Sequence, residues 1–301
     1  MAVGTWRQGM FEGFSDVSAT VDGIKIHALM AGAGPALLLL HGHPQTHAIW
    51  HKVAPTLARQ FTIVVADLRG YGDSGKPPGE PDHANYAKRR MALDQVRLMQ
   101  ALGLPTFAVI GHDRGGRVAA RMALDHPDVV SRLVTLDVAP TLAMYQQTSF
   151  EFARAYWHWF FLVRPSPFPE TLIRADPDLY LKQTMGARSA GLKPFAPEAY
   201  AAYLRCLSDP ATAHGICEDY RASVGIDLEH DQADLAAGKQ IQCPFLALWG
   251  RDGVIERCFD PLAEWRRWNP GVKGMALPCG HYIPEEAPEV LLDHVLAFLP
   301  S

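Results

Sequence analysis

The stretch Val109-Ile110-Gly111-His112-Asp113-Arg114-Gly115-Gly116-Arg117 places one acidic residue between glycines. An apolar run at residues 107–110 stops at Gly111, and a segment rich in Ala and Arg begins at Gly115. This pattern predicts a strand, a sharp turn and a helix, with Asp113 at the apex of the turn. The flanking glycines let the backbone pass closely around a strained, exposed side chain. We therefore interpret the stretch as a nucleophile elbow; the simpler interpretation is an Asp that caps the helix.

An aspartate at this apex predicts a particular chemistry. Its carboxylate is already ionised at neutral pH, so it needs no neighbouring base to remove a proton. Attack by this carboxylate leaves a covalent ester on Asp113. We therefore expect the first electrophile to be an alkyl carbon and not an amide carbonyl.

Buried strands alternate with helical segments along much of the chain, which predicts a mostly parallel sheet with helices on both faces. Residues 15–30 are typical of a hairpin with Asp22-Gly23 as its turn. The expected buried strands lie at residues 36–40, 61–66, 107–110, 132–137 and 244–249. From 140 to 239 the chain is rich in aromatic residues and proline and reads as helical. We expect an α/β core formed by residues 1–139 and 240–301, and an inserted helical lid formed by 140–239.

The overall composition narrows the class of protein. The chain has 301 residues, a hydrophobic content of 48% and a net charge of −4. This charge argues against nucleic acid or an anionic membrane as partner, although a small anionic substrate could bind a local arginine cluster. The five cysteines are scattered and form no C-x-x-C pair, so neither a disulfide framework nor a zinc site is expected. We find no secretory signal and no apolar run of ~20 residues, and expect a cytoplasmic protein.

Three further residues are candidates to complete a catalytic set with Asp113. In the α/β-hydrolase fold the order along the chain is nucleophile, acid, histidine. His281 comes late, follows Gly280 after a predicted strand, and fits the base. Asp137 and Asp252 each follow a predicted strand, so the spacing leaves both open as the acid that orients His281.

The oxyanion hole of this fold consists of two backbone N–H groups. We expect them from Arg114, directly after the nucleophile, and from His43 in the turn His41-Gly42-His43-Pro44. In this chemistry the hole would stabilise the tetrahedral species that forms on Asp113 itself when water attacks the ester.

The histidines near this turn also raise the question of a metal. His41, His43, His47 and His51 are close in sequence, and the last two stand four residues apart. Ala48 occupies the place where the H-E-x-x-H motif has its glutamate. No later cluster completes a ligand set, so we predict no metal.

Arg114 and Arg117 stand three residues apart at the start of the predicted helix, and therefore on one face beside the nucleophile. Two guanidinium groups there would keep Asp113 ionised. They would also bind a substrate carboxylate through bidentate hydrogen bonds. The alternative interpretation is a pair of surface arginines. It fits Arg117 better than Arg114, which directly follows Asp113.

The lid contains two aromatic segments, Tyr156-Trp157-His158-Trp159-Phe160-Phe161 and Asp219-Tyr220-Arg221. Such residues most often serve only core packing. The functional interpretation is that the N–H and O–H donors of His158, Trp159 and Tyr220 converge on a leaving group.

Four segments together resemble the fluoroacetate (haloacetate) dehalogenases, and the resemblance covers nearly the whole chain, lid included. They are Gly111-His112-Asp113-Arg114-Gly115-Gly116-Arg117, Tyr156-Trp157-His158-Trp159, Glu218-Asp219-Tyr220-Arg221-Ala222 and Asp227-Leu228-Glu229-His230-Asp231. The resemblance implies that Asp113 is the nucleophile, His281 the base and Asp137 the acid. It further implies that Arg114 and Arg117 bind the carboxylate, and that His158, Trp159 and Tyr220 bind the halide. It also implies a homodimer without a cofactor.

Two departures from this family bear on the size and polarity of the pocket. His43 stands where the family usually has Phe or Tyr, and a lid Trp carried by some members near residues 184–189 is absent. We expect hydrolysis of short 2-haloacids to 2-hydroxyacids. The two departures make this expectation stronger for the cleavage of other carbon–halogen bonds than for the C–F bond. An epoxide hydrolase, which would use two lid tyrosines, and a hydrolase-fold sensor without turnover are the alternatives.

Overall fold

The computed structural model describes residues 9–299 and contains one eight-stranded sheet, in the order β1-β2-β4-β3-β5-β6-β7-β8. The strands are β1 (Ser15–Val21), β2 (Ile24–Ala31), β3 (Ala36–Leu40), β4 (Thr62–Ala66), β5 (Phe107–His112), β6 (Val130–Leu136), β7 (Phe245–Gly250) and β8 (Lys273–Leu277). The β1–β2 and β2–β4 pairs are antiparallel and the other five pairs are parallel. The predicted α/β fold with a mostly parallel sheet is confirmed. Val21 pairs with Ile24, so the predicted hairpin turns at Asp22-Gly23.

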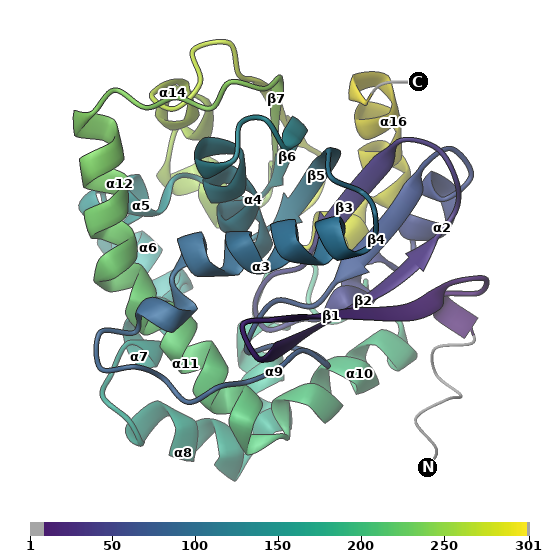
Figure 1. The fold of residues 1–301 in the computed structure, drawn as a ribbon. Helices are drawn as coiled ribbons and strands as arrows, with labels where there is room; N and C mark the ends of the chain where they lie inside the picture. Colours follow the sequence, from purple (N-terminus) through teal and green to yellow (C-terminus); the bar gives the residue numbers. More distant parts are fainter. Residues whose placement is uncertain (1–8, 300–301) are drawn as a thin grey trace.

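Helices cover the sheet on the side that faces the viewer in Figure 1, where α3 and α4 lie in front of the strands. The short helices of the core are η1 (His47–Trp50), α2 (Ala54–Leu57), η2 (Ala84–Tyr86), α13 (Val254–Cys258), α14 (Pro261–Arg266) and α15 (Ile283–Glu286). The longer ones are α3 (Lys88–Ala101), α4 (Arg114–Asp125) and α16 (Pro288–Phe298). Helix α4 ends just before His126-Pro127, because proline at the next position cannot continue a helix.

Residues 140–239 form only helices between β6 and β7, as expected from their lack of buried-strand runs. They are α5 (Thr141–Gln146), α6 (Phe150–Ala155), α7 (Trp157–Leu162), α8 (Phe168–Ala175), α9 (Pro177–Thr184), α10 (Pro197–Leu207), α11 (Pro210–Val224) and α12 (Ile226–Ala236). In Figure 1 helices α7 to α10 lie together along the lower side of the molecule, and α11 joins them to the core through Asp219, which bonds to Lys88 at the start of α3 and to Arg114 at the start of α4. We call residues 140–239 the lid, and its role as a separate unit over the site remains our proposal.

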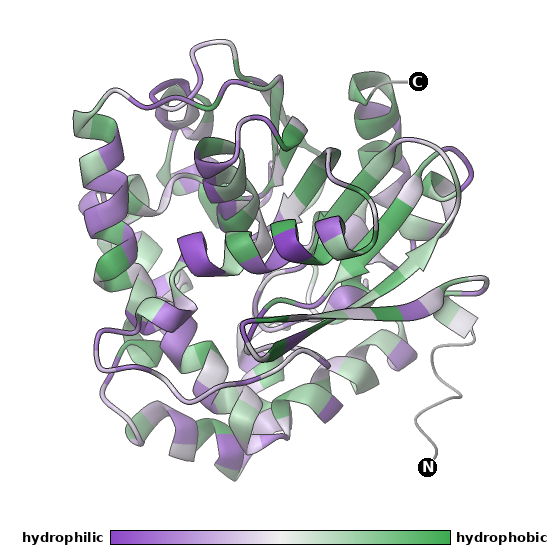
Figure 2. Ribbon diagram, viewed as in Figure 1, coloured by the Kyte–Doolittle hydropathy of each residue, from purple (hydrophilic) through white to green (hydrophobic). Residues whose placement is uncertain are grey.

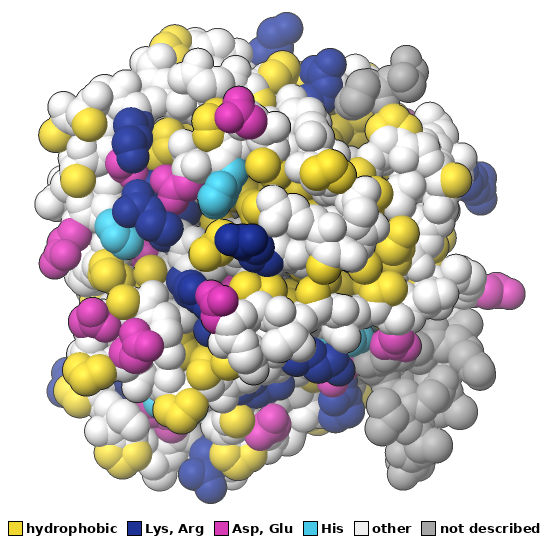
Figure 3. All heavy atoms as spheres, viewed as in Figure 1, with side chains coloured by type: hydrophobic (Ala, Val, Ile, Leu, Met, Phe, Trp, Pro, Cys, Tyr) yellow, Lys and Arg dark blue, Asp and Glu magenta, His cyan; other side chains and the backbone are white. Residues whose placement is uncertain are grey.

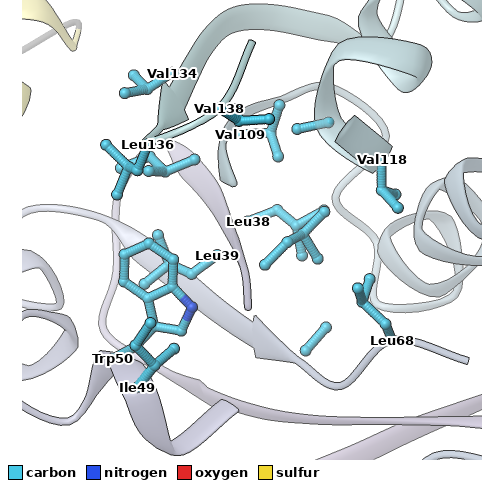
Figure 4. Close-up of a cluster of buried hydrophobic side chains, with 14 of the residues drawn as sticks. Leu38, Leu39, Ile49, Trp50, Leu68, Val109, Val118, Val134, Leu136 and Val138 are labelled. Carbon is cyan, nitrogen blue, oxygen red and sulfur yellow. The ribbon is translucent and has the colours of Figure 1, made fainter. Parts of the chain in front are cut away.

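The central strands are mostly apolar, as Figure 2 shows for β3, β4 and β5. Leu37 to Leu40 of β3 are fully buried. Both faces of such a strand are covered, so its sequence is continuously apolar and does not alternate. In Figure 4 the side chains of Leu38 and Val109 lie on the side of Val118 of α4, whereas Leu39 and Leu136 lie on the side of Trp50 of η1. This core holds the C-terminal ends of the three strands rigidly, and those ends carry the residues of the site.

The surface carries mixed charge. On the face in Figure 3 basic and acidic side chains stand next to one another, so their fields offset each other on this side. Among the described helices, none is both long enough and apolar enough to cross a membrane.

Candidate active site

Asp113 lies at the turn between β5 and α4, with a backbone φ of 49° and ψ of −113°. A residue other than glycine rarely adopts this conformation, and such strain is typical of functional turns. The glycines make room for the turn: a Cβ on Gly111 would lie 2.3 Å from the carbonyl oxygen of Gly115, and one on Gly115 would lie 2.4 Å from that of His41. The Asp113 side chain makes no capping hydrogen bond to α4. The predicted strand, turn and helix are therefore present. Asp113 does not make the capping hydrogen bond that the helix-cap interpretation requires.

The Asp113 carboxylate is buried close to two histidines and two arginines. Its Oδ1 accepts a hydrogen bond of 2.9 Å from the backbone N–H of His43, one of the two donors expected for the oxyanion hole. Burial acts to raise the pKa of Asp113, but His281, His112, Arg117 and Arg114 outweigh it and hold this pKa well below its usual range. The carboxylate is consequently ionised, as a nucleophile of this type must be.

His281 is oriented by Asp137, because its Nδ1 lies 2.5 Å from Asp137 Oδ2. The other oxygen of Asp137 accepts the backbone N–H of Gly250 at 2.8 Å, so neighbouring β7 fixes the carboxylate. The ring Nε2–H of His112 donates to the backbone oxygen of His281 at 2.8 Å. This bond ties the loop that carries His281 to the residue before Asp113. Asp252 is exposed, and its backbone N–H bonds to Cys279. Of the two acids that the spacing left open, Asp137 is the one in contact with His281.

Arg114 is fully buried, and most of its guanidinium is bound by the lid. Its Nε and Nη2 donate to the carboxylate of Asp219 on α11 at 2.8 and 2.7 Å, and Nη2 also donates to Ser223. Lys88 of α3 and the hydroxyl of Tyr71 bind the same carboxylate. Within residues 9–299 only Nη1 of this buried guanidinium lacks a hydrogen-bond partner. In the described chain Nη1 of Arg114 is therefore the guanidinium nitrogen that is left for a ligand. The hydrogen bonds to Asp219 fix the orientation of the guanidinium and so the direction of the Nη1–H groups.

Arg117 is held by the beginning of the lid. Its Nη1 donates to the carbonyl of Ala139 at 3.0 Å and to the hydroxyl of Thr141 at 2.8 Å. Its guanidinium carbon lies 4.7 Å from the ring centre of Trp159, and its Nε has no partner in the described chain. Both arginines are thus buried beside Asp113, and neither is a surface residue.

The three residues predicted to bind a halide come together with His43. The ring centres of His43 and Tyr220 are 5.3 Å apart, those of His43 and His158 5.6 Å, and those of Trp159 and Tyr220 6.2 Å. Trp159 Nε1 and the Tyr220 hydroxyl are buried without a hydrogen-bond partner within residues 9–299. Burial raises the pKa of Tyr220 well above its ordinary value, so the hydroxyl stays a donor. Buried donors without a partner are few in native proteins, and two here, beside the free Nη1 of Arg114, suit an electron-rich ligand.

His43 occupies the pocket as a neutral ring. Burial lowers its pKa to about 3, and Arg114 and Arg188 act in the same direction. Its Nε2 lies 2.9 Å from the Tyr180 hydroxyl of α9, which ties the β3 loop to the lid. His43 therefore places a polar ring beside Asp113 without adding a charge.

The other histidines of this region bond to different partners. His51 bonds to the backbone of Ala48, whereas His47 bonds through Nδ1 to Asp67 at 2.9 Å. Ligand atoms of His27, His47, Asp67 and Asp73 lie within 4.8 Å of one another. Hydrogen bonds of His27 and His47 to Asp67 account for this cluster as a brace of the loop after β4.

Several contributors to the site could not be recognised from sequence alone. Asp219 belongs to a segment used for the family resemblance, but only its contact with Arg114 reveals its task. Tyr180 and Arg188 carry no local motif. Arg188 lies in the lid segment 184–189, and its guanidinium stacks 4.3 Å from the ring centre of Tyr156.

The sequence and the structure of this chain are similar to those of several known proteins. Residues 35–288 match the family described as the alpha/beta hydrolase fold. A fluoroacetate dehalogenase of Burkholderia sp. is 47% identical over 281 residues, which are 93% of this chain and 92% of the relative. A soluble epoxide hydrolase of Corynebacterium sp. (strain C12) is 36% identical over 93% of this chain and 95% of its own length. The solved structure of a candidate α/β hydrolase from Nostoc sp. PCC 7120 superposes with a TM-score of 0.92 at 51% identity, covering 96% of this chain and 99% of the other.

Proposed function

The chain belongs to the α/β-hydrolase family, and from that premise we propose that it is a hydrolytic dehalogenase of short 2-haloacids. Its substrates would be haloacetates, fluoroacetate included, and its products the 2-hydroxyacid and halide. The relative in Burkholderia sp. named as a fluoroacetate dehalogenase supports this class of reaction. The observation that carries the proposal is an ionised, buried Asp113 beside two buried arginines and two buried lid donors, Trp159 and Tyr220, that find no hydrogen-bond partner among residues 9–299.

The reaction would proceed in two steps. Asp113 attacks the α-carbon in line with the carbon–halogen bond, the halide leaves with the bonding electrons, and an ester forms. His281, held by Asp137, then takes a proton from water, which attacks the ester carbonyl and releases the 2-hydroxyacid. The backbone N–H of His43, which already binds Asp113 Oδ1, is suited to the oxyanion formed in this second step.

The leaving halide would lie against the donors of His158, Trp159 and Tyr220. Arg114 Nη1 and Arg117 Nε are the guanidinium N–H groups that the described chain leaves for the substrate carboxylate. Their positive charge also acts to keep Asp113 ionised. Fluoride is a small, basic leaving group and depends on short donors more than bromide does.

The test measures halide release from fluoro-, chloro- and bromoacetate by the wild-type protein and by His281→Asn. Because a general base serves only the second step, His281→Asn should release one halide per site and then stall with Asp113 esterified, which peptide mass spectrometry detects. In heavy-oxygen water, a single turnover of the wild type should label Asp113 and leave the hydroxyacid unlabelled. Label in the product of that first turnover would exclude the covalent route.

Two matched variants test which aspartate orients His281. Asp137→Asn should slow ester hydrolysis, since it removes the carboxylate 2.5 Å from His281. Asp252→Asn makes the same change at an exposed aspartate and should do much less. A larger loss from Asp252→Asn would mean that the acid is wrongly assigned.

Epoxide hydrolysis is the second candidate, because two lid tyrosines are placed for it. The hydroxyls of Tyr156 and Tyr220 are both buried without partners in the described chain, and such a pair could protonate an epoxide oxygen. The Corynebacterium relative is named as an epoxide hydrolase. An epoxide panel beside the haloacetates decides: Tyr156→Phe should abolish epoxide opening if this candidate holds, and should leave chloroacetate turnover measurable if the first does.

We further propose that the protein works as a homodimer in the cytoplasm. Phe168 and Leu172 of α8 and Leu179 of α9 are large apolar side chains, each about half exposed, on adjoining lid helices. Such a group supports a protein contact through the lid. Light scattering after gel filtration would give a monomer mass if this is wrong.

A further inference from the structure

Arg188 brings a third guanidinium to the site, and it comes from the lid, unlike Arg114 and Arg117. It stacks on Tyr156 and donates from Nε to the carbonyl of Thr184 at 3.3 Å. Among residues 9–299 it makes no ion pair within 4.0 Å. The fork of Arg114 is used by Asp219 and that of Arg117 by Ala139 and Thr141, so Arg188 is the arginine least committed to protein acceptors.

The position of Arg188 relative to the reacting groups follows from Tyr156. The Tyr156 ring centre lies 5.3 Å from that of His158 and 6.2 Å from that of His281. A guanidinium stacked on this ring therefore lies at the edge of the site between the proposed halide donors and the base. Burial lowers the pKa of His158, and the charge of Arg188 is the next cause, which also indicates that this charge reaches the pocket.

A groove of about 470 Å³ lies next to the lid segment that carries Arg188, and its charged lining residues are Lys52, Lys193, Asp252, Glu285 and Glu286. Ser189 and Ala190 of the lid line one side, next to Arg188 in sequence, and Cys279 and Gly280 before the catalytic histidine line the other. A substituent of the substrate that points toward Tyr156, away from Arg114 and Arg117, would approach the Arg188 guanidinium.

We propose that Arg188 is a specificity-determining residue that binds a second carboxylate, so that the substrates include 2-halodicarboxylates such as 2-chlorosuccinate. This inference rests on the proposed dehalogenation. The carboxylate next to the reacting carbon is bound at Arg114 and Arg117, and the carboxylate of the side chain pairs with Arg188. The chemistry is unchanged: Asp113 forms the ester at C2 while chloride leaves, and water then gives the 2-hydroxydicarboxylate and a proton.

The experiment compares 2-chlorosuccinate with 2-chlorobutyrate, which has the same number of carbons but an uncharged side chain. Chloride release gives kcat/KM for both substrates with the wild type, with Arg188→Gln and with Arg174→Gln. Arg174 is an exposed arginine of α8, so its substitution removes the same charge from the same lid. We expect the wild type to prefer 2-chlorosuccinate. Arg188→Gln should reduce that preference about ten- to hundredfold, the size of one charge-assisted hydrogen bond, and Arg174→Gln should leave it unchanged.

Each outcome has one meaning. If Arg188→Gln lowers kcat/KM equally for both substrates, Arg188 only latches the lid on Tyr156, and the inference is wrong. If the wild type does not prefer 2-chlorosuccinate, the inference is also wrong. Chloroacetate is measured with every preparation: turnover of chloroacetate without the preference refutes the role of Arg188 alone, whereas no halide release from any substrate refutes dehalogenation itself.

Discussion

Replacing Asp219 by Asn should destabilise the protein and disturb the site through Arg114. The carboxylate is fully buried and accepts two hydrogen bonds from Arg114, at 2.8 and 2.7 Å, one from Tyr71 at 2.7 Å and one from Lys88. Asparagine has nearly the same volume but no charge, so the change leaves two buried cations facing one amide. Lys88 keeps Asp227, 3.6 Å away, whereas no other carboxylate within residues 9–299 pairs with Arg114.

The expected loss follows from breaking a buried ion pair from one side, which costs about 3–5 kcal/mol. With an unfolding entropy of about 2.1 cal/mol/K per residue, this loss lowers the Tm of a chain of this length by roughly 5–8 °C. Urea unfolding gives the free energy of unfolding, and a thermal melt gives the Tm. Chloroacetate turnover at 20 °C, where the variant is still folded, reports whether Nη1 of Arg114 has moved.

A double-mutant cycle with Lys88→Met separates charge from packing. Lys88→Met alone removes one of the two cations that Asp219 pairs with and should cost stability. In the Asp219→Asn background it removes a cation that has lost its nearer partner and keeps only Asp227 at 3.6 Å, and should cost much less or stabilise. A loss below about 1 kcal/mol for Asp219→Asn, or additive losses in the cycle, would refute the view that Asp219 neutralises this buried cluster.

Three further predictions address the substrate and the pH. Arg114→Lys keeps the charge but loses the planar fork that binds Asp219, so kcat/KM for chloroacetate should fall roughly ten- to hundredfold and that for neutral chloroacetamide much less; equal losses would contradict a role in carboxylate binding. Trp159→Phe and Tyr220→Phe each remove one buried donor, and fluoride release should suffer about tenfold more than bromide release; equal losses would mean that both residues only pack the lid. Burial raises the pKa of Glu285 from 4.5 to about 8, so the folded state holds a proton that the unfolded state has lost between these values, and stability should fall as pH rises through this window, by at most about 5 kcal/mol. Urea unfolding at pH 5.5 and 8.5 should show a smaller fall for Glu285→Gln, and an unchanged fall would contradict the raised pKa.

Much of the fold is encoded in short stretches. The elbow follows from glycines two residues on either side of Asp113, and the strands follow from apolar runs that end at turn residues. The predicted limits were close: α4 begins at Arg114 instead of Gly115, and β6 begins at Val130, two residues before the predicted start. Such limits shift because the first turn of a helix and the edge of a strand depend on packing as much as on propensity.

The sequence by itself predicted the chemical character of the protein from an aspartate in an elbow, a late histidine, and two arginines in the first helical turn after that aspartate. Each of these signals depends on neighbours within a few residues, or on chain order in a familiar fold. Only the tertiary structure brought Asp137 to His281, because Asp137 follows β6, His281 follows β8, and both strands lie beside β7. It also decided that Arg114 is bound by Asp219, 105 residues away, and that Arg188 reaches the site from the lid. Ion pairs and stacking between distant segments depend on how the lid docks on the core, and no local pattern of residues encodes that docking.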